Sequence, residues 1–376
     1  MGPLRGIKND AMAHHRLSAV ILAAGEGTRM RSERPKPLHL LCGRPMILHV
    51  LDAMAEIDVT RVVVVVGHRA DWVTKTLVQH APSSIRIEFV EQETQSGTGD
   101  ALAVGLTGLP DDDFEDEDVV VLPGDTPLLR PATLAALVRY HRTQGAGATL
   151  LSAEVVDSRG YGRVVHGKDG VVTRVVEEVD ATDDERDITE VNTSIYCFRR
   201  SILAPALRRL TPANAQGEYY LTDAISVLFS AGYRVQSLVL PDSIEAAGVN
   251  DRAQLAVAEA ELRDRINERW MRRGVTMWDP ERTYVDAAVE LAADVSLLPG
   301  VILRGRCVVG EGSEVGPNCF LTDTTVGRQA VVTESTCERA AIGDGARIGP
   351  FCVVQAGAEV AAGTVVPPHS VVAPDQ

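Results

Sequence analysis

A six-residue spacing of small apolar residues near the C-terminus constrains the fold of this chain more than any other feature. Val289, Val295, Val301 and Cys307 follow one another at intervals of six, and glycines recur nearby. This period is typical of a parallel β-helix, because one inward-facing residue in each short strand lets stacked coils share a continuous core. Chance periodicity in a segment rich in valine and glycine is the alternative. We expect residues 281–376 to form a short β-helix.

Before position 250 the sequence has a different pattern. Apolar runs typical of buried strands alternate with helical patterns, as in residues 61–66, 70–80 and 85–90. This alternation predicts an α/β domain over residues 17–250, with a mainly parallel, Rossmann-like sheet. Further strands are expected at residues 17–22, 119–122, 149–155, 171–176, 194–198 and 234–239, and further helices at residues 45–57, 131–144 and 221–231.

Two segments flank these regions. Residues 253–273 have the pattern of one long helix without Gly or Pro, and we assign residues 251–280 to a helical linker. Residues 1–16 are expected to form a loose N-terminal extension, within which Met12 could be the true start.

Charge and cysteine content exclude several classes of function. The chain carries 37 basic and 52 acidic residues, which gives a net charge of −15. It has no basic block of the kind that binds a nucleic-acid backbone, so we do not expect DNA or RNA as a partner. Its acidic residues concentrate at 111–118 and 180–187, where we expect solvated loops rather than metal sites. The six cysteines form no Cys-x-x-Cys pair, so neither a zinc site nor a disulfide framework is indicated. No segment matches a membrane span or a signal peptide, and we expect a cytoplasmic protein without membrane partners.

A glycine-rich turn directly after the first strand indicates a phosphate site. The sequence there is Leu22-Ala23-Ala24-Gly25-Glu26-Gly27-Thr28-Arg29-Met30, and Lys36 follows. Gly25 and Gly27 would let backbone N–H groups approach phosphate oxygens, while Arg29 and Lys36 add cationic donors. The turn lacks the third glycine of a dinucleotide fingerprint and the Gly-Lys-Ser/Thr of a P-loop. A tight turn without function is the alternative, and the two cations count against it.

Three later segments add candidate ligands. Gln92, in a Gln-x-x-Gln-Ser-Gly-Thr-Gly run, offers the donor and acceptor that suit the imide edge of uracil. Asp125 ends a buried strand and is a natural Mg²⁺ ligand, although a helix cap ahead of Pro131 explains it equally well. A spread set could hold sugar hydroxyls and supply a second metal ligand; it comprises residues 160–163, Glu177, 190–193 and 248–252.

Taken together, these segments resemble the bacterial N-acetylglucosamine-1-phosphate uridylyltransferase family over about residues 17–349. The resemblance rests on the glycine-rich turn, Pro35-Lys36, Gly97-Thr98-Gly99, Gly124-Asp125, Gly160-Tyr161-Gly162-Arg163, Glu190-Val191-Asn192-Thr193, Asn214 to Tyr220, and Gly248-Val249-Asn250. In that family an N-terminal domain makes UDP-N-acetylglucosamine, and a C-terminal left-handed β-helix, usually trimeric, acetylates glucosamine 1-phosphate with acetyl-CoA. The resemblance therefore implies a left-handed helix, a homotrimer, Mg²⁺, and UTP with an amino-sugar 1-phosphate as substrates.

The same resemblance implies a role for individual residues. Uracil and its nucleoside would be held by Leu22, Ala23, Ala24, Gly25, Gln92, Gly97 and Thr98. Phosphates would face Arg29 and Lys36, which with Asp125 form the expected catalytic set. Mg²⁺ would be held by Asp125 and Asn250, and the amino sugar by Gly162, Glu177 and Asn192.

The sequence departs from the family pattern in places that bear on function. The His-x-x-Tyr and Ala-Gly-Thr-Ile-Thr-x-Asn-Tyr-Asp-Gly runs of the acetyltransferase site are not found, so we expect that second activity to be missing. His369 lies in a Pro-Pro-His-Ser turn and is expected to be a solvated residue rather than a base. Ser194 replaces a glycine and Asp100 replaces a histidine, which leaves the preferred sugar open.

The resemblance thus implies a Mg²⁺-dependent uridylyltransferase in cell-wall precursor synthesis, with N-acetylglucosamine 1-phosphate as its acceptor. One alternative keeps the fold but changes the substrates to glucose 1-phosphate or to dTTP. Another is a non-catalytic nucleotide-sugar-binding subunit, and the presence of Arg29, Lys36 and Asp125 counts against it.

Overall fold

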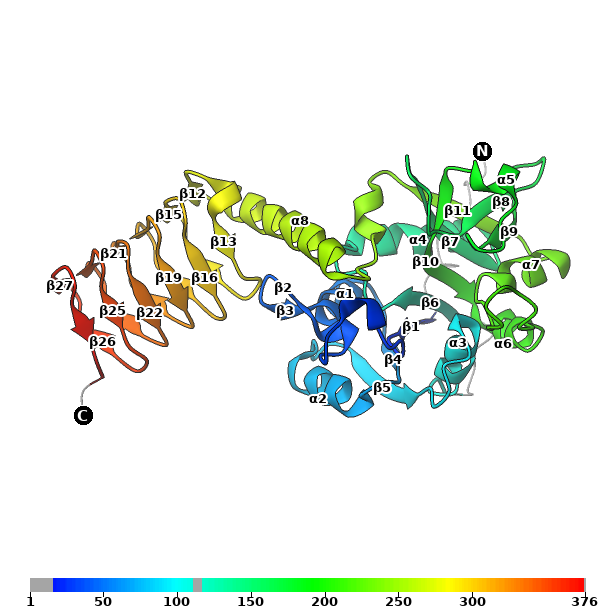
Figure 1. Cartoon of the computed structure of the whole chain (residues 1–376), viewed down its shortest axis with the longest axis horizontal. Helices are drawn as coiled ribbons and strands as arrows, with labels where there is room; N and C mark the ends of the chain where they lie inside the picture. The colour runs from blue at the N-terminus through cyan, green and yellow to red at the C-terminus, as the bar shows by residue number, and fades with distance from the viewer. Residues whose placement is uncertain (1–15, 111–116, 375–376) are drawn as a thin grey trace, which may run out of the picture. The chain divides into compact units, whose positions relative to one another are not determined.

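The computed structural model describes residues 16–110 and 117–374, and it divides the chain into two compact units. The first unit comprises residues up to 39 and residues 46–254, and the second comprises residues 40–45 and the chain from 255 onward (Figure 1). Residues 1–15 of the expected N-terminal extension, with Met12, and acidic residues 111–116 lie outside the described residues, whereas Arg16, the last residue of that extension, begins the first strand. Within the described ranges, no helix has the length and apolar character needed to cross a membrane.

The first unit is built on a sheet that has nine strands in the described residues, with β11-β7-β10-β6-β1-β4-β5 as its main path. Strand β1 (Arg16–Leu22) lies between β4 (Arg61–Val66) and β6 (Glu117–Pro123), and β5 (Arg86–Glu91) extends the sheet beyond β4. All four run parallel. Their apolar runs are buried on both faces in β1, β4 and β6, as central parallel strands require.

The other half of the sheet is mixed. Strand β10 (Glu190–Arg199) runs antiparallel to β6 and to β7 (Ala148–Glu154), while β11 (Val235–Leu240) is parallel to β7. Strand β8 (Arg163–His166), which the sequence did not indicate, pairs with β10 and with β9 (Val172–Val176). The expected mainly parallel α/β fold is confirmed, with an antiparallel insertion at this end.

Helices cover both faces of this sheet. One face packs against α1 (Met46–Ala55), α2 (Ala70–His80) and α4 (Pro131–Gln144), which share a core with alternate strand residues such as Ile21 and Val64. The opposite face packs against α3 (Thr98–Leu106), α6 (Arg200–Leu207) and α7 (Asp223–Ser230), which share a core with Val20 and Val63. Successive strand residues therefore point to opposite faces, and each face acquires its own helical layer.

The end of the first acidic segment is not a solvated loop. Glu117 and Asp118 belong to β6 and are buried. Glu117 is ion-paired with Arg200, and Asp118 accepts a 2.7 Å hydrogen bond from Nε of Arg142. Burial alone would raise the pKa of Asp118, but the hydrogen bonds and charges of His141 and Arg142 outweigh it and lower that pKa. The expectation was wrong at these two positions because distant cations neutralise the carboxylates.

The second acidic segment also contains ordered structure. Helix α5 (Asp183–Arg186) is a single turn, and Thr182 and Glu185 form a reciprocal capping box at its start. Glu185 is buried, whereas Asp183 and Asp184 are exposed. The solvated loop expected at 180–187 is therefore only partly correct.

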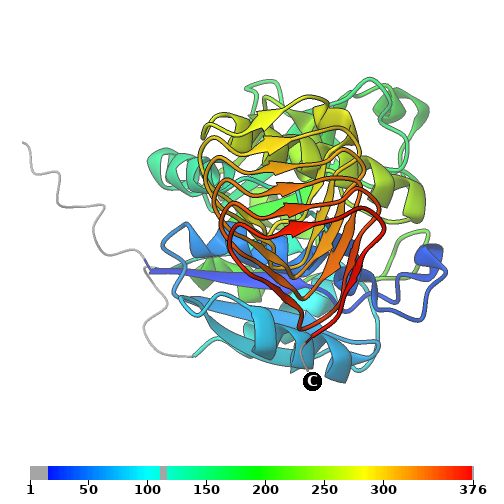
Figure 2. The same ribbon diagram turned by 90° about the vertical axis from the view of Figure 1, so that its left-hand side faces the viewer.

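The second unit contains the β-helix that the six-residue period predicts. Short strands stack into three parallel sheets: β12-β15-β18-β21-β24-β27, β13-β16-β19-β22-β25-β28, and β14-β17-β20-β23-β26. Figure 2 shows the triangular outline of the stacked coils. Val289, Val295, Val301 and Cys307 all lie in the core, with side chains at most 2% exposed. This unit is the expected left-handed β-helix.

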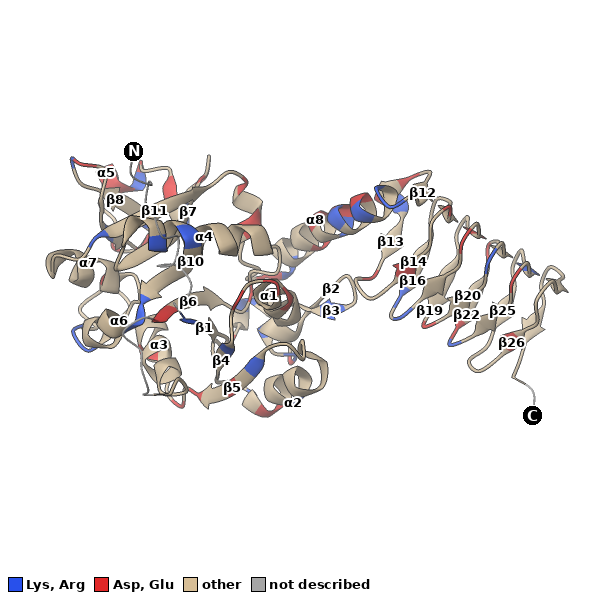
Figure 3. Ribbon diagram, turned by 180° about the vertical axis from the view of Figure 1, so that it is seen from behind, with Lys and Arg blue, Asp and Glu red and all other residues tan. Residues whose placement is uncertain are grey.

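Helix α8 (Arg252–Met271) is more than a linker, because its last turns help to form the core of the second unit. Ile266 and Trp270 are buried among the first coils of the β-helix. Basic and acidic residues are interspersed along the helix (Figure 3), and they include the half-buried pair Arg265–Glu261 at 2.7 Å. The short hairpin of β2 (Leu40–Leu41) and β3 (Arg44–Pro45) joins this unit too, which the sequence did not indicate.

Candidate active site

A pocket of about 530 Å³ opens in the first unit at the carboxyl ends of the parallel strands. Leu22 ends β1, Pro123 ends β6, and Gln92 directly follows β5; all three line it. Ligands of open α/β sheets bind at this edge. With the exception of Gly162, every expected site residue lines the pocket: Leu22, Ala23, Ala24, Gly25, Arg29, Lys36, Gln92, Gly97, Thr98, Asp125, Glu177, Asn192 and Asn250.

The glycine-rich turn is shaped around Lys36. Gly27 has a φ of 63°, and a Cβ added to it would lie 2.6 Å from Cβ of Lys36, so only glycine fits. Gly25 has no atom within 4 Å of such a Cβ, which leaves open space beside the backbone. Arg29 and Lys36 each lie in a short 3₁₀ helix, Thr28–Met30 and Lys36–Leu38.

Four expected residues from three parts of the chain meet in this pocket. The ammonium of Lys36 is ion-paired with Oδ2 of Asp125 and donates a 2.8 Å hydrogen bond to Oδ1 of Asn250. Nη2 of Arg29 donates to the same Asn250 oxygen at 2.9 Å. Two cations and two oxygen donors therefore form one cluster, although up to 221 positions separate them in sequence.

The donor set of this cluster fits a hard divalent cation. The Asp125 carboxylate and the Asn250 amide oxygen both contact one ammonium, so they already surround a point that holds positive charge. Magnesium sites commonly use one or two protein oxygens and complete their shell with substrate phosphates and water. Among the residues that the structure describes, no three His, Cys, Asp or Glu side chains are grouped for metal binding. An all-protein metal cage is thus not found there.

Gln92 lies in the pocket wall and is held there by two hydrogen bonds. Its side chain is 5% exposed, and Nε2 donates to Oδ2 of Asp100 at 2.7 Å and to the carbonyl of Gly97 at 3.3 Å. Gly97 has a φ of 114°, and an added Cβ would lie 2.6 Å from the carbonyl oxygen of Tyr219. Gln95, which was not an expected site residue, donates to the carbonyl of Ala24 at 2.8 Å and ties this wall to the glycine-rich turn.

A second wall carries the residues expected to hold a sugar. Oε1 of Glu177 accepts a 2.9 Å hydrogen bond from Thr222, and burial, followed by the charges of Asp223 and Asp180, raises the pKa of Glu177. Gly162 lies behind Glu177 instead of in the lining, and a Cβ added to it would be 3.4 Å from Oε2 of Glu177. The structure therefore does not place Gly162 among the pocket-lining residues.

Asn192 completes this wall through its own internal contacts. Its Nδ2 donates to the hydroxyl of Tyr196 at 2.8 Å, and its Oδ1 accepts from the backbone of Ser194 at 3.3 Å. Ser194 lines the pocket at an irregular point in β10, where its φ is +62°. Glycine adopts this conformation with less strain, so the serine is held there by the surrounding strand.

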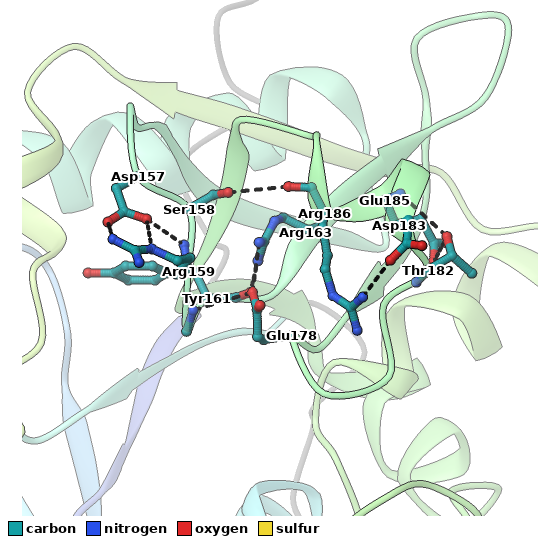
Figure 4. A network of polar contacts seen from close by, with 11 residues as sticks. Asp157, Ser158, Arg159, Tyr161, Arg163, Glu178, Thr182, Asp183, Glu185 and Arg186 are labelled. Carbon is teal, nitrogen blue, oxygen red and sulfur yellow. Dashed lines mark hydrogen bonds and ion pairs between the residues drawn. The ribbon is translucent and has the colours of Figure 1, made fainter.

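An ion pair that the sequence did not indicate holds the loop that carries Gly160 and Tyr161, which line the pocket (Figure 4). Arg163 is 1% exposed, donates to the carbonyl of Tyr161, and pairs with Glu178 at 2.7 Å. Glu178 also accepts from the backbone N–H of Gly160 at 3.3 Å. No sequence pattern marks Glu178, because its partners lie across a strand pair.

Comparisons with known proteins agree with this geometry. A family described as "Nucleotidyl transferase" matches residues 18–278, and "Bacterial transferase hexapeptide (six repeats)" matches residues 339–374. The chain is 46% identical over 327 residues to "Bifunctional protein GlmU" of Thermobifida fusca (strain YX), covering 87% of this chain and 67% of that protein. It belongs to the GlmU family of nucleotidyl transferases.

Other relatives carry the same name. "Bifunctional protein GlmU" of Heliobacterium modesticaldum is 42% identical over 91% of this chain and 73% of that protein. The protein of that name from Streptomyces avermitilis is 43% identical over 92% of this chain and 71% of the relative. The resemblance drawn from the sequence motifs is confirmed, and so is the expectation of a nucleotidyltransferase.

Proposed function

We propose that this GlmU-family chain transfers UMP from UTP to N-acetylglucosamine 1-phosphate, giving UDP-N-acetylglucosamine and pyrophosphate. The observation that carries the proposal is the cluster of Arg29, Lys36, Asp125 and Asn250 in one pocket with Gln92. The cations of this cluster would face phosphates, and Gln92, which lines the same pocket, has an amide suited to a uracil edge. A non-catalytic binding subunit would not require this cluster.

The reaction needs positioning and charge neutralisation more than proton transfer. A phosphate oxygen of the sugar phosphate attacks the α-phosphorus of UTP, a new P–O bond forms, and the bond to the β-phosphate breaks as pyrophosphate leaves. Arg29 and Lys36 would hold the phosphates and offset the charge that develops on the leaving group. Asp125 and Asn250 would hold Mg²⁺, which supplies further neutralisation of phosphate charge when bound.

The choice of sugar is proposed from the second wall of the pocket. Glu177 would accept a hydrogen bond from a sugar hydroxyl, and Asn192 would contact another substituent of the same sugar. Ser194 adds a hydroxyl and a Cβ to this wall, which favours testing glucose 1-phosphate and glucosamine 1-phosphate beside the N-acetylated sugar.

Pyrophosphate release from UTP, Mg²⁺ and a panel of sugar 1-phosphates tests the proposal. We expect turnover to be highest with N-acetylglucosamine 1-phosphate and to fall below detection in Asp125→Ala. Asp184→Ala removes an exposed carboxylate from the same unit and should leave turnover unchanged. An intact wild-type protein that releases no pyrophosphate with any member of the panel refutes the proposed reaction.

The β-helix supports a further proposal, that the chain forms a homotrimer. One sheet of the β-helix has apolar side chains that face outward and are exposed to solvent. They include Tyr284 at 43%, Val353 at 43% and Val371 at 64% exposure. Exposed apolar rows of this kind commonly mark an interface. Light scattering coupled to size-exclusion chromatography measures the mass directly, and a monomer at micromolar concentration contradicts a stable trimer.

A further inference from the structure

The buried amide of Gln92 is held in a fixed orientation by two acceptors. Nε2 lies 2.7 Å from Oδ2 of Asp100 and 3.3 Å from the carbonyl oxygen of Gly97. A carboxylate at neutral pH and a peptide carbonyl both only accept hydrogen bonds, so the group that faces them has to be the NH₂ end of the amide. Turning the amide over would place its oxygen against two other oxygens inside a buried wall. The orientation is thus dictated by Asp100 and Gly97.

This arrangement determines what Gln92 offers to the pocket that it lines. Both of its N–H bonds are directed at Asp100 and Gly97, while no described residue donates to Oε1. The amide oxygen is the group left for a ligand. It can accept from an N–H but cannot donate to a base nitrogen or carbonyl.

Pyrimidine bases differ at the atom that such an oxygen would meet. Uracil and thymine carry a proton on N3, whereas cytosine has a lone pair there and would face the oxygen with a second acceptor. We propose that Asp100 is a positioning residue that fixes Gln92 as an acceptor and so makes the site select uracil-type over cytosine-type nucleotides. The proposal rests on the uridylyltransferase function proposed above, and it assigns the choice of base to a residue that need not touch the nucleotide.

Asp100 also lies in the first turn of α3, where a carboxylate stabilises the helix end. That role alone would make Asp100 a stability residue without influence on the base. The two roles differ in what they predict: loss of helix stabilisation lowers the melting temperature for every substrate alike, whereas loss of amide orientation changes the ratio of UTP to CTP use.

Asp100→Asn separates the two roles. The asparagine amide can donate as well as accept, so Gln92 would gain access to the reversed orientation that presents its NH₂ group to the base. Glu93→Gln is the matched control, because it removes one negative charge from an exposed position next to Gln92. Both variants and the wild type are assayed with UTP and with CTP at a fixed, saturating sugar 1-phosphate concentration.

We expect Asp100→Asn to lower the ratio of kcat/KM for UTP to that for CTP by roughly tenfold or more, since an unsatisfied or mispaired buried polar group is the basis of strong substrate discrimination. The KM for the sugar 1-phosphate should stay within about twofold, and Glu93→Gln should keep the wild-type ratio. If Asp100→Asn does not fold, Asp100→Ser, whose hydroxyl can also donate, is expected to lower the ratio in the same way.

A folded Asp100 variant that keeps the wild-type UTP to CTP ratio overturns the proposal, even if its melting temperature falls. This outcome is distinct from failure of the proposed function, in which the wild type itself would release no pyrophosphate from UTP. Equal use of UTP and CTP by the wild type would also refute the assignment of Asp100 while leaving nucleotidyl transfer intact.

Discussion

Removal of the Glu178 carboxylate is predicted to weaken binding of the sugar phosphate without changing UTP binding. Glu178 links buried Arg163 to the backbone of Gly160, and the same loop lines the pocket through Gly160 and Tyr161 (Figure 4). In Glu178→Ala, Arg163 would keep its bond to the Tyr161 carbonyl but lose its ionic partner. The loop would then be held at one point where it is now held at two.

The size of the effect follows from the burial of the pair. Removing one partner of a fully buried ion pair costs about 3–5 kcal/mol of stability. The Glu178 side chain is 30% exposed, so water replaces part of the interaction that Arg163 would lose. An effect of about 2 kcal/mol is therefore expected. If binding of the sugar phosphate has to restore the order of the loop, its KM rises by up to roughly 30-fold, because about 1.4 kcal/mol corresponds to a factor of ten.

Steady-state pyrophosphate release, with each substrate varied in turn, measures both KM values. Glu178→Gln keeps an acceptor oxygen and should lie between the wild type and Glu178→Ala. The hydrogen bond from Arg163, the largest contribution, lowers the pKa of Glu178, so the stabilisation is present above the ordinary glutamate pKa and disappears as pH falls through the lowered value. The gap in melting temperature between wild type and Glu178→Ala should narrow in acid. A sugar-phosphate KM within twofold of wild type in folded Glu178→Ala refutes the role assigned to this ion pair.

Three further predictions concern other parts of the chain. Gly97→Ala forces a Cβ toward the carbonyl of Tyr219 at a positive φ, and we expect a loss of about 1–3 kcal/mol in unfolding free energy with a higher KM for UTP; unchanged denaturation and kinetics would contradict this. Leu321→Ala should cost about 2–5 kcal/mol in denaturant unfolding of the β-helix, where this side chain is fully buried, and a cost below about 1 kcal/mol would show that the coils collapse around the cavity. Burial raises the pKa of Glu177, so its carboxylate is protonated at a higher pH than an ordinary glutamate when the solution is acidified. The KM for the sugar phosphate should therefore begin to rise at that higher pH. A pH profile of KM that is the same in Glu177→Gln would contradict this role of Glu177.

The sequence predicts the parallel strands and the β-helix well, because strands that are buried on both faces and coils that share a core need apolar residues in recognisable patterns. The valine run of β4 and the periodic helices α2 and α4 were placed at the observed residues. The six-residue series Val289, Val295, Val301 and Cys307 follows from the same rule, since each side of a coil needs an inward-facing apolar residue.

Elements that depend on distant partners were missed. Helix α3 begins in Gly97-Thr98-Gly99, which has the composition of a loop, and its first turn is fixed by Tyr219 through a 2.7 Å bond from the backbone of Gly99. Helix α6 contains Pro205, which argues against a helix in a local reading. The sequence also gives no local sign that residues 40–45 pack in the second unit, because this packing depends on the Asp286 side chain beside Gly43. Local propensity carries no information about such contacts.

The candidate site residues could be grouped from the sequence only because a family resemblance joined them, and the structure adds that all of them except Gly162 line one pocket. Lys36 contacts both Asp125 and Asn250, the residues proposed to hold a metal, whereas Arg29 contacts Asn250. The ammonium of Lys36 offsets the charge of the Asp125 carboxylate. In the proposed reaction, nucleotide phosphates would compete for Lys36 and Arg29, and a cation that turned toward a phosphate would leave an oxygen of Asp125 or Asn250 for a metal ion. We therefore expect nucleotide and metal binding to be coupled through Lys36, because phosphoryl transfer would need both the cationic side chains and the metal to compensate the phosphate charge.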